Sequence, residues 1–241
     1  CVVDSCINKC SVLPSSRVYL HGGRNLGLRK PQEGRKPNLD TSCSPNETRP
    51  YITLRVLRSH TLSKAEKRDA IPSARFVLLK DITDQGFTFF TNYESRKADE
   101  IAENPNVALT FYWLPLRRSI RIEGSAEKVS RSESETYFHQ RPRASQIGAL
   151  ASPQSRPIPT REYLDRKEQE IKDQLGPDGV VPLPNWGGYL VRPRVVEFWQ
   201  GQTNRLHDRI RFRKLLKEGE TVDGELLHQG EGGWFYDRLA P

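Results

Sequence analysis

Residues 68–241 alternate short apolar runs with turns and amphipathic stretches, a pattern typical of a mainly β domain. Runs that are rich in β-branched and aromatic residues, or that alternate apolar with polar residues, predict strands at 74–80, 87–91, 107–114, 119–124, 188–191, 195–200, 209–213 and 234–238. The first two are separated by a turn-rich segment and predict a hairpin. One more alternating run, 51–57, stands apart from the others.

Helices are predicted between these strands from capping residues and helix breakers. We expect Ser95, Ser132 and Thr160 to begin three helices, the second of which is limited by Pro142. The third runs to about Leu175, and 145–150 forms a short helical piece. The connections are too short and irregular for repeated βαβ units. The elements therefore predict an antiparallel β-barrel with helices packed outside it.

The charge of the chain is concentrated in its first quarter. The 241 residues carry a formal +8, but residues 1–67 hold 12 Lys/Arg and 5 Asp/Glu, a net +7. All four cysteines lie there too, in a C-x4-C-x3-C spacing with a distant Cys43 that matches no zinc pattern. We predict that 1–67 is a basic, cysteine-containing tail, disordered or foreign to the domain, and that 68–241 is the functional domain. No metal is expected.

Targeting signals are weak. No apolar stretch approaches the roughly 20 residues of a membrane span, and no secretory signal is recognisable. Methionine is absent, even at position 1, which indicates processing, a fragment or an imperfect reading of a gene. A cytoplasmic location is expected, or a mitochondrial one if the basic leader is a transit peptide.

Two groups of residues predict phosphate binding. Ser95-Arg96-Lys97 places a hydroxyl and two cations at a helix N-terminus, where free backbone N–H groups favour an anion. Tyr137, Arg141 and Ser145 recur every fourth residue, although Pro142 interrupts a shared helical face. The alternatives are a solvated helix start and an amphipathic surface.

A third group follows an aromatic strand. If Arg205-Leu206-His207-Asp208-Arg209 is extended, Arg205, His207 and Arg209 point the same way. Two guanidinium groups beside an imidazole favour an anion between them. A structural ion-pair network through Asp208 is the alternative.

These residues resemble the pyridoxine/pyridoxamine 5′-phosphate oxidase family, whose members are FMN enzymes of the split-barrel flavoprotein class. The resemblance covers 68–241 in family order. Its main stretches are PSAR through Lys80, FTN at 90–92, SRKA at 95–98, YFHQRP at 137–142, SQIGA at 145–149, QS at 154–155, WGGY at 186–189, EFWQG at 197–201, RLHDR at 205–209 and the terminal DRLAP.

The resemblance implies a split barrel, a homodimer with FMN at the subunit interface, and oxidation of pyridoxine or pyridoxamine 5′-phosphate to pyridoxal 5′-phosphate, with O2 as acceptor and H2O2 as product. It implies no nucleic-acid or membrane partner. It assigns Arg205 and His207 to catalysis around the substrate ring. It assigns the substrate phosphate to Lys80, Tyr137, Arg141 and Ser145. It assigns FMN contacts to Arg75, Phe76, Val77, Leu78, Leu79, Lys80, Phe90, Thr91, Arg96, Lys97, Ser119, Gln154, Ser155, Trp199 and Arg209.

Two departures from the family pattern leave alternatives open. Ser119 stands where relatives have a flavin-contacting Gln, which predicts weaker or altered FMN binding. The segment 62–67 is polar where the family has its first barrel strand, so that strand is missing or is replaced by 51–57. The alternatives are a related flavoprotein with another substrate, an impaired member or splice product that binds FMN or pyridoxal phosphate weakly, and a nucleic-acid-binding module that works through the basic tail.

Overall fold

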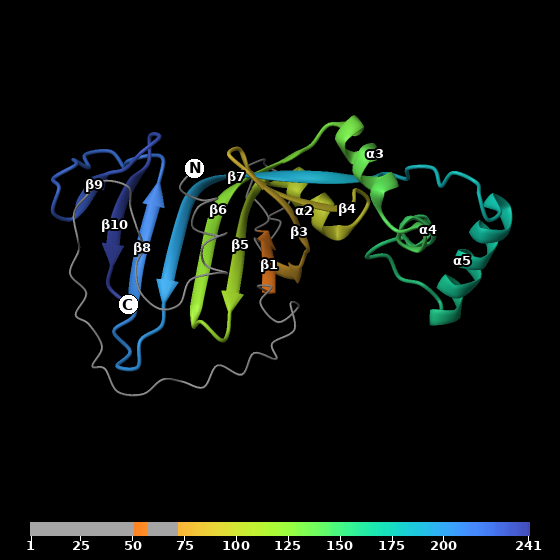
Figure 1. The fold of residues 1–241 in the computed structure, drawn as a ribbon, viewed down its shortest axis with the longest axis horizontal. Helices are drawn as coiled ribbons and strands as arrows, with labels where there is room; N and C mark the ends of the chain where they lie inside the picture. Colours follow the sequence, from red (N-terminus) through yellow and green to blue (C-terminus); the bar gives the residue numbers. More distant parts are fainter. Residues whose placement is uncertain (1–50, 57–71) are drawn as a thin grey trace, which may run out of the picture. The chain divides into compact units, whose positions relative to one another are not determined.

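The computed structural model describes residues 51–56 and 72–241, which lie in one compact unit, Pro50–Pro241. The described residues form one sheet of ten strands accompanied by four helices (Figure 1). The strands are β1 (Tyr51–Val56), β2 (Ser73–Phe76), β3 (Leu79–Thr83), β4 (Gly86–Asn92), β5 (Asn106–Trp113), β6 (Arg118–Lys128), β7 (Trp186–Gln200), β8 (Asp208–Arg213), β9 (Leu227–Gln229) and β10 (Phe235–Leu239). The helices are α2 (Arg96–Glu103), α3 (Arg131–Gln140), α4 (Arg143–Ala151) and α5 (Arg161–Leu175).

Every strand pairing is antiparallel, as predicted. The main path is β2-β1-β5-β6-β7-β8-β10-β9, and β4 joins β3 to the first part of β7. No ladder joins β2 to β3, so hydrogen bonds do not close the sheet. Only Val77 and Leu78 connect those two strands along the chain. The prediction of one continuous strand over 74–80 is therefore wrong, because the chain leaves the β2 ladder before it enters the β3 ladder.

The isolated run near the start of the described residues is part of the sheet. Strand β1 pairs with β2 on one side and with β5 on the other, in a register that places Leu54 between Arg75 and Leu109. A strand over 51–57 was predicted, and its backbone takes a place in the barrel. The polar segment 62–67 lies outside the described residues.

The core of the barrel follows the alternation of its strands. In β5 and β6 every second residue is buried, and Phe111, Ile120 and Ile122 are at most 2% exposed. Phe87 and Phe89 of β4 close the same core. This period of two is the one that predicted the strands, because alternate side chains of a strand face the same side of a sheet.

Strand β7 corrects a second prediction. The runs 188–191 and 195–200 were expected as two strands, but Pro193, which cannot donate a ladder hydrogen bond, lies inside one continuous strand. They are one strand, since the β6 register shifts between Glu123 and Gly124, opposite Pro193. A Cβ on Gly124 would lie 2.1 Å from the carbonyl oxygen of Arg192, so only glycine permits this close approach.

The helices agree with the sequence more closely than the strand ends do. Helices α2 and α5 occupy the predicted ranges. The cap of α3 is Ser130 rather than Ser132: the Ser130 hydroxyl accepts from the Glu133 amide at 3.1 Å, and the Glu133 carboxylate accepts from the Ser130 amide at 3.1 Å. This reciprocal pair is a capping box, which begins the helix one residue before Ser132. The short strand β9 was not predicted.

A second buried cluster joins the helices to the sheet. Phe138 of α3, Ile147 of α4 and Trp186 of β7 pack together with Val181 from the α5–β7 connection. This cluster holds α3 and α4 against the first residues of β7. Among the residues that the structure describes, no helix is both long and apolar enough to cross a membrane.

Candidate functional site

Three predicted residues that are far apart in the sequence meet beside the N-terminus of α2. The Lys97 ammonium donates to the Thr91 hydroxyl at 2.8 Å and to Oε1 of Gln154 at 2.7 Å. The Thr91 hydroxyl also donates to the same Gln154 oxygen at 3.0 Å. Thr91 is the penultimate residue of β4, and Gln154 follows α4. The structure thus brings together residues that the sequence separates by up to 63 positions.

Two predicted arginines, Arg75 and Arg96, lie close to Lys97 and share one carboxylate. Oε2 of Glu100 accepts from Nη1 of Arg75 at 2.7 Å, and Oε1 accepts from Nε of Arg96 at 2.8 Å. Ser73 also donates to Oε2, at 2.6 Å. Glu100 is 1% exposed. We call Arg75, Thr91, Arg96, Lys97, Glu100 and Gln154 the α2 cluster. Sequence analysis missed Glu100, although its i,i+4 spacing from Arg96 is a recognisable signal.

The electrostatics of the α2 cluster favour an anion. Burial, and then the neighbouring Arg75, lower the pKa of Lys97 to about 8. Burial alone would raise the pKa of Glu100, but hydrogen bonds from Arg75, Ser73 and Arg96 hold it below its usual value. Three cations therefore surround one ionised carboxylate. The excess positive charge would be stabilised by a bound phosphate.

A second group lies against an aromatic stack. The rings of Phe90 and Trp186 stack at 5.2 Å between centres, and Tyr137 lies 4.2 Å from Phe90. The Arg141 guanidinium lies 4.7 Å from the centre of the Trp186 ring, and the Lys80 ammonium 5.6 Å from that of Tyr137. We call Lys80, Phe90, Tyr137, Arg141 and Trp186 the α3 cluster. It contains three of the four predicted substrate-phosphate residues.

Arg141 is held in place but has an unused donor. Its backbone N–H donates to Phe138, and its carbonyl accepts from the Gln146 side chain at 2.7 Å. Its Nη1 atom is buried and has no hydrogen-bond partner among the residues that the structure describes, and burial lowers the pKa of the guanidinium. A buried guanidinium nitrogen without an acceptor is costly, so the site is suited to an incoming anion.

The fourth predicted phosphate residue is on a different helix. Ser145 lies in the first turn of α4, while Tyr137 is in α3 and Arg141 caps that helix. The expected shared helical face does not exist, because Pro142 separates the two helices. Ser145 is half-buried.

Five further residues that are predicted to contact FMN, Phe76 to Leu79 and Ser155, lie at the β2–β3 break and after α4. Phe76 and Leu78 are each 71% exposed, and Val77 and Leu79 adjoin them. Ser155 follows Gln154 with a φ of 69°, in the left-handed region that non-glycine residues rarely occupy. Both segments flank the α2 cluster along the chain.

The third predicted group lies at the other end of β7. His207 accepts from the Gln202 amide at 3.0 Å through Nδ1, and its ring lies 4.9 Å from Trp199. Arg205 is exposed and has a φ of 64°. The expectation that 205–209 is extended is therefore wrong, because the chain turns at Arg205 and β8 begins only at Asp208. We call Trp199, Arg205, His207 and Arg209 the loop cluster.

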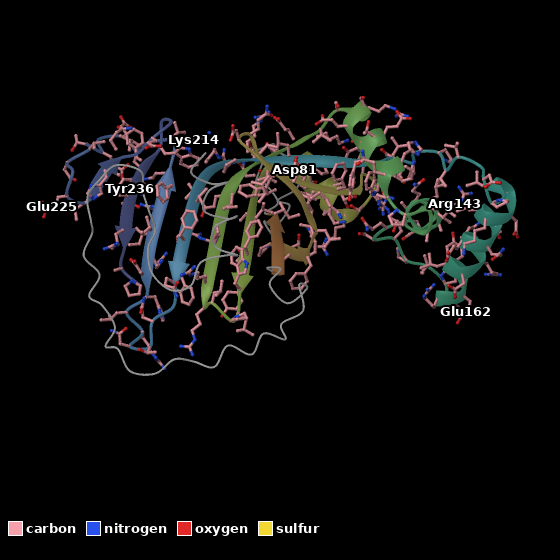
Figure 2. All side chains as sticks on the ribbon, in the orientation of Figure 1. Asp81, Arg143, Glu162, Lys214, Glu225 and Tyr236 are labelled. Carbon is pink, nitrogen blue, oxygen red and sulfur yellow. The ribbon has the colours of Figure 1, made fainter. Side chains whose placement is uncertain are left out.

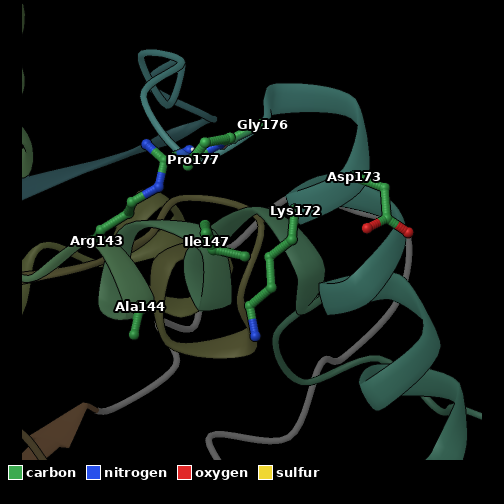
Figure 3. Close-up of a pocket in the computed structure, with 7 residues that line it drawn as sticks. All are labelled: Arg143, Ala144, Ile147, Lys172, Asp173, Gly176 and Pro177. Carbon is green, nitrogen blue, oxygen red and sulfur yellow. The ribbon is translucent and has the colours of Figure 1, made fainter.

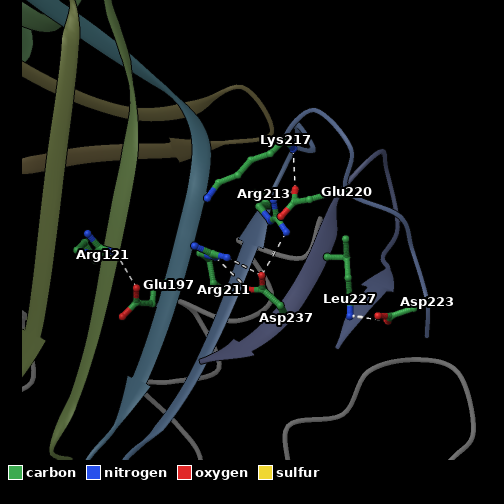
Figure 4. A network of polar contacts seen from close by, with 9 residues as sticks. All are labelled: Arg121, Glu197, Arg211, Arg213, Lys217, Glu220, Asp223, Leu227 and Asp237. Atoms are coloured by element: carbon green, nitrogen blue, oxygen red, sulfur yellow. Dashed lines mark hydrogen bonds and ion pairs between the residues drawn. The ribbon is translucent and has the colours of Figure 1, made fainter. Parts of the chain in front are cut away.

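Arg209 is bound within the chain. It contacts Oε1 of Glu197 through Nε and Nη2, both at 3.0 Å, and donates to the Ala240 carbonyl at 2.9 Å. Glu197 also accepts from Arg121 at 2.7 Å, as Figure 4 shows. The alternative of an ion-pair network is thus partly right, but its acid is Glu197, while Asp208 pairs with Arg238. Ser119 lies opposite Trp199 in the β6–β7 register.

The loop cluster is far from the other two clusters within one chain. Trp186 begins β7 and Trp199 lies near its end, so about 40 Å of strand separates them at about 3.3 Å per residue. Figure 1 shows α3 and α4 at the start of β7 and β8 beside its far half. One chain therefore does not bring all the predicted residues into a single site.

A pocket of about 610 Å³ lies elsewhere, between α4 and α5 (Figure 3). Its lining includes Arg143, whose guanidinium donates to the carbonyls of Gly176, at 2.6 Å, and Gly179. Those bonds satisfy carbonyls at the C-terminus of α5. None of the predicted site residues lines this pocket, so it is not the candidate site.

The fold defines a class of protein, the split-barrel flavoproteins. PhzG from Burkholderia lata 383, solved with tetrahydrophenazine-1-carboxylic acid, superimposes with a TM-score of 0.63 at 24% identity, over 81% of this chain and 83% of its own. An FMN-binding protein from Nostoc punctiforme, related to pyridoxamine 5′-phosphate oxidase, gives a TM-score of 0.54 at 16% identity, over 79% and 88%. At these identities the likeness shows the fold.

Sequence comparison gives the family. The family model described as pyridoxamine 5′-phosphate oxidase matches residues 59–174, and that of the pyridoxine 5′-phosphate oxidase C-terminal dimerisation region matches 186–241. Pyridoxine-5′-phosphate oxidase of Bos taurus is 55% identical over 175 residues, which is 72% of this chain and 67% of the relative. The Bombyx mori pyridoxine/pyridoxamine 5′-phosphate oxidase is 55% identical over 72% and 68%. The chain belongs to the pyridoxamine 5′-phosphate oxidase family.

Proposed function

We propose that this chain oxidises pyridoxine 5′-phosphate or pyridoxamine 5′-phosphate to pyridoxal 5′-phosphate, with FMN as cofactor, O2 as acceptor and H2O2 as product. The observation that carries the proposal is the unpartnered, buried Nη1 of Arg141 beside Tyr137, within the same barrel as the cation-rich α2 cluster. Two separate places thus favour a phosphate, as an enzyme that binds two phosphate esters requires. Family membership identifies the esters.

The residues present fit an FMN phosphate at the α2 cluster. Arg75, Arg96 and Lys97 would hold it, while Thr91 and Gln154 orient Lys97. When bound, FMN would supply the two-electron chemistry that the protein side chains lack. Trp199 and Arg209 would complete its contacts.

The substrate phosphate belongs at the α3 cluster. Arg141 would donate from its free Nη1, with Lys80, Tyr137 and Ser145 as further donors. Anchoring this end of the substrate would restrict where its C4′ carbon can lie, which raises the effective concentration of the reacting groups. Arg205 and His207 would hold the pyridine ring and take part in moving the alcohol or amine proton.

The separation of the clusters supports a homodimer with shared sites. The loop cluster lies about 40 Å of strand away from the α3 cluster, and residues 186–241 match a dimerisation region. Each site would then combine the α2 and α3 clusters of one chain with the loop cluster of its partner. The domain boundary at residue 68 and the cytoplasmic location remain predictions from the sequence.

The test begins with the purified full chain. We expect a yellow protein with a flavin absorption band that forms pyridoxal 5′-phosphate from pyridoxine 5′-phosphate and consumes O2. A colourless chain that takes up no added FMN would contradict the proposed activity.

A second candidate is an impaired member that binds FMN weakly. Ser119 favours it, because its short side chain lies opposite Trp199, at a position where the family resemblance implies a longer amide. A Ser119→Gln variant separates the two. A large gain in FMN affinity and turnover would support the impaired member, whereas a change within about twofold would support the active enzyme.

A further inference from the structure

Glu100 is a buried carboxylate whose two oxygens contact three groups on two elements. Oε1 accepts from Arg96 on α2, while Oε2 accepts from Arg75 and Ser73 on β2. The carboxylate is ionised, because these bonds outweigh its burial. It therefore ties the end of β2, just before the break in the barrel, to the first turn of α2.

The contacts fix both arginines and leave hydrogen-bond donors free. Nη1 and Nη2 of Arg75 are directed by Glu100, at 2.7 Å, and by the Ser73 hydroxyl, at 2.8 Å. Within the described part of the chain, Arg96 contacts Glu100 through Nε alone, which leaves its two terminal nitrogens for a ligand, and its side chain is 55% exposed. A guanidinium that is hydrogen-bonded along one edge presents its other edge in a defined orientation.

The charge balance points the same way. Arg75, Arg96 and Lys97 carry three positive charges and Glu100 one negative charge. The remaining two match a phosphate dianion. Without Glu100 the three cations would repel one another, and the two arginines would lose the contacts that order their side chains.

We propose that Glu100 is a positioning residue that holds Arg75 and Arg96 in the orientation in which they bind the phosphate of FMN. This inference rests on the proposed function. It also makes a distinctive prediction, since removing a negative charge beside an anion site would by itself strengthen anion binding. Weaker binding would therefore report lost orientation rather than altered charge.

The experiment compares two flavins that differ only in the phosphate. Fluorescence titration of the flavin-free protein gives the Kd of FMN and of riboflavin for wild type and Glu100→Gln. We expect the FMN Kd to rise at least ~10-fold and the riboflavin Kd to change less than about twofold. An FMN Kd that is unchanged or lower would overturn the inference. Parallel weakening of both flavins would overturn it too, because a structural role predicts that result.

A matched control uses another buried carboxylate between two arginines. Asp237 contacts Arg211 at 2.6 Å and Arg213 at 3.3 Å (Figure 4). It lies on β10, which pairs with β8 and β9 and not with β2. Asp237→Asn should lower the melting temperature and leave the ratio of FMN to riboflavin affinity unchanged. A shift in that ratio as large as that of Glu100→Gln would contradict a specific role for Glu100.

A milder variant covers the case in which Glu100→Gln does not fold. Ser73→Ala removes the hydroxyl that bridges Arg75 and Glu100, and we expect an FMN-specific loss of about threefold. No FMN-specific loss in a folded Ser73→Ala protein would overturn the proposal. A wild-type protein that binds FMN no better than riboflavin would overturn the proposed function itself, and this inference with it.

Discussion

The helix-bearing part of the barrel and the β7–β8 loop treat their positive charges differently. In the α2 cluster three cations share the single carboxylate of Glu100. Among the described residues, Lys97 donates only to neutral oxygens and Nη1 of Arg141, in the α3 cluster, has no acceptor. In the loop cluster, Arg209 is bound to a buried carboxylate and to a carbonyl. Figure 2 shows the corresponding regions along the sheet, with Arg143 on the α4 side and Lys214 and Tyr236 on the β8–β10 side.

This difference indicates that the two regions have different roles in binding. The helix-bearing part carries more positive than negative charge, in side chains that hydrogen bonds and packing hold in place, and such an excess favours a bound phosphate. In the loop cluster Arg209 is paired with Glu197, whereas Arg205 is exposed. Arg205 is therefore suited to contact a ligand that is bound elsewhere. The following variants test this difference between the two regions, in decreasing order of the effect that we expect.

Arg141→Ala should have the largest effect. Removing a buried guanidinium from a phosphate site should lower kcat/KM for pyridoxine 5′-phosphate by about 10²–10³-fold, mainly through KM, while FMN content is kept. Steady-state kinetics and flavin absorbance measure both. Arg143→Ala is the control, since Arg143 binds carbonyls at the end of α5 and should affect stability alone. An unchanged KM in Arg141→Ala would remove the α3 cluster from the substrate site.

Arg205→Ala should lower turnover by about 10²-fold and leave FMN content nearly intact, because the proposed role of Arg205 is to hold the substrate ring. Equal loss of turnover and FMN in purified protein would refute this assignment.

Mixing Arg205→Ala chains with Arg141→Ala chains, then unfolding and refolding them together, tests the shared site. Mixed dimers would contain one intact site, so activity should rise well above that of either variant alone. No rise would place both clusters of a site in one chain.

The pH dependence of FMN binding should report Lys97. Its pKa of about 8 lies below the usual 10.5, and a bound phosphate would raise it again. The protonated form therefore binds FMN better, and affinity should fall as pH rises above about 8, by up to ~10-fold per pH unit. In the absence of FMN, the same group makes the protein more stable as pH rises from about 8 towards 10.5, because the unfolded chain binds more protons. A Lys97→Arg variant should lose both dependences. A flat profile in the wild type would show that Lys97 does not contact the phosphate.

Ser130→Ala should have the smallest effect. The loss of the capping box on α3 should cost about 1 kcal/mol and lower the melting temperature by about 2–4 °C. Because Tyr137 is in the middle of α3 and is held by ring contacts, KM should stay within about twofold. A KM change as large as that of Arg141→Ala would mean that the α3 cluster depends on helix stability rather than on its packed rings.

The sequence predicted elements best where the signal was local. The β-forming residues of 107–114 and the alternation in 119–124 predicted β5 and β6 to within a few residues, because both signals lie within the strand itself. The prediction failed at β7, where two strands were expected but one strand continues through Pro193, opposite a bulge at Gly124. The cap of α3 was assigned to the wrong serine because two serines lie two residues apart, and only the hydrogen bonds to Glu133 distinguish them.

The antiparallel fold class, the family and the residue types that could bind two phosphates were predictable from the sequence. Three features were visible only in the folded chain: Lys97 contacts Thr91 and Gln154, Glu100 joins two arginines, and the loop cluster lies at the far end of β7. The reason is physical. Alternation and capping act over two to four residues, whereas Arg75 and Glu100 are 25 positions apart and Thr91 and Gln154 are 63 apart. The partners of such contacts are set by the register of the sheet and the packing of the helices against it.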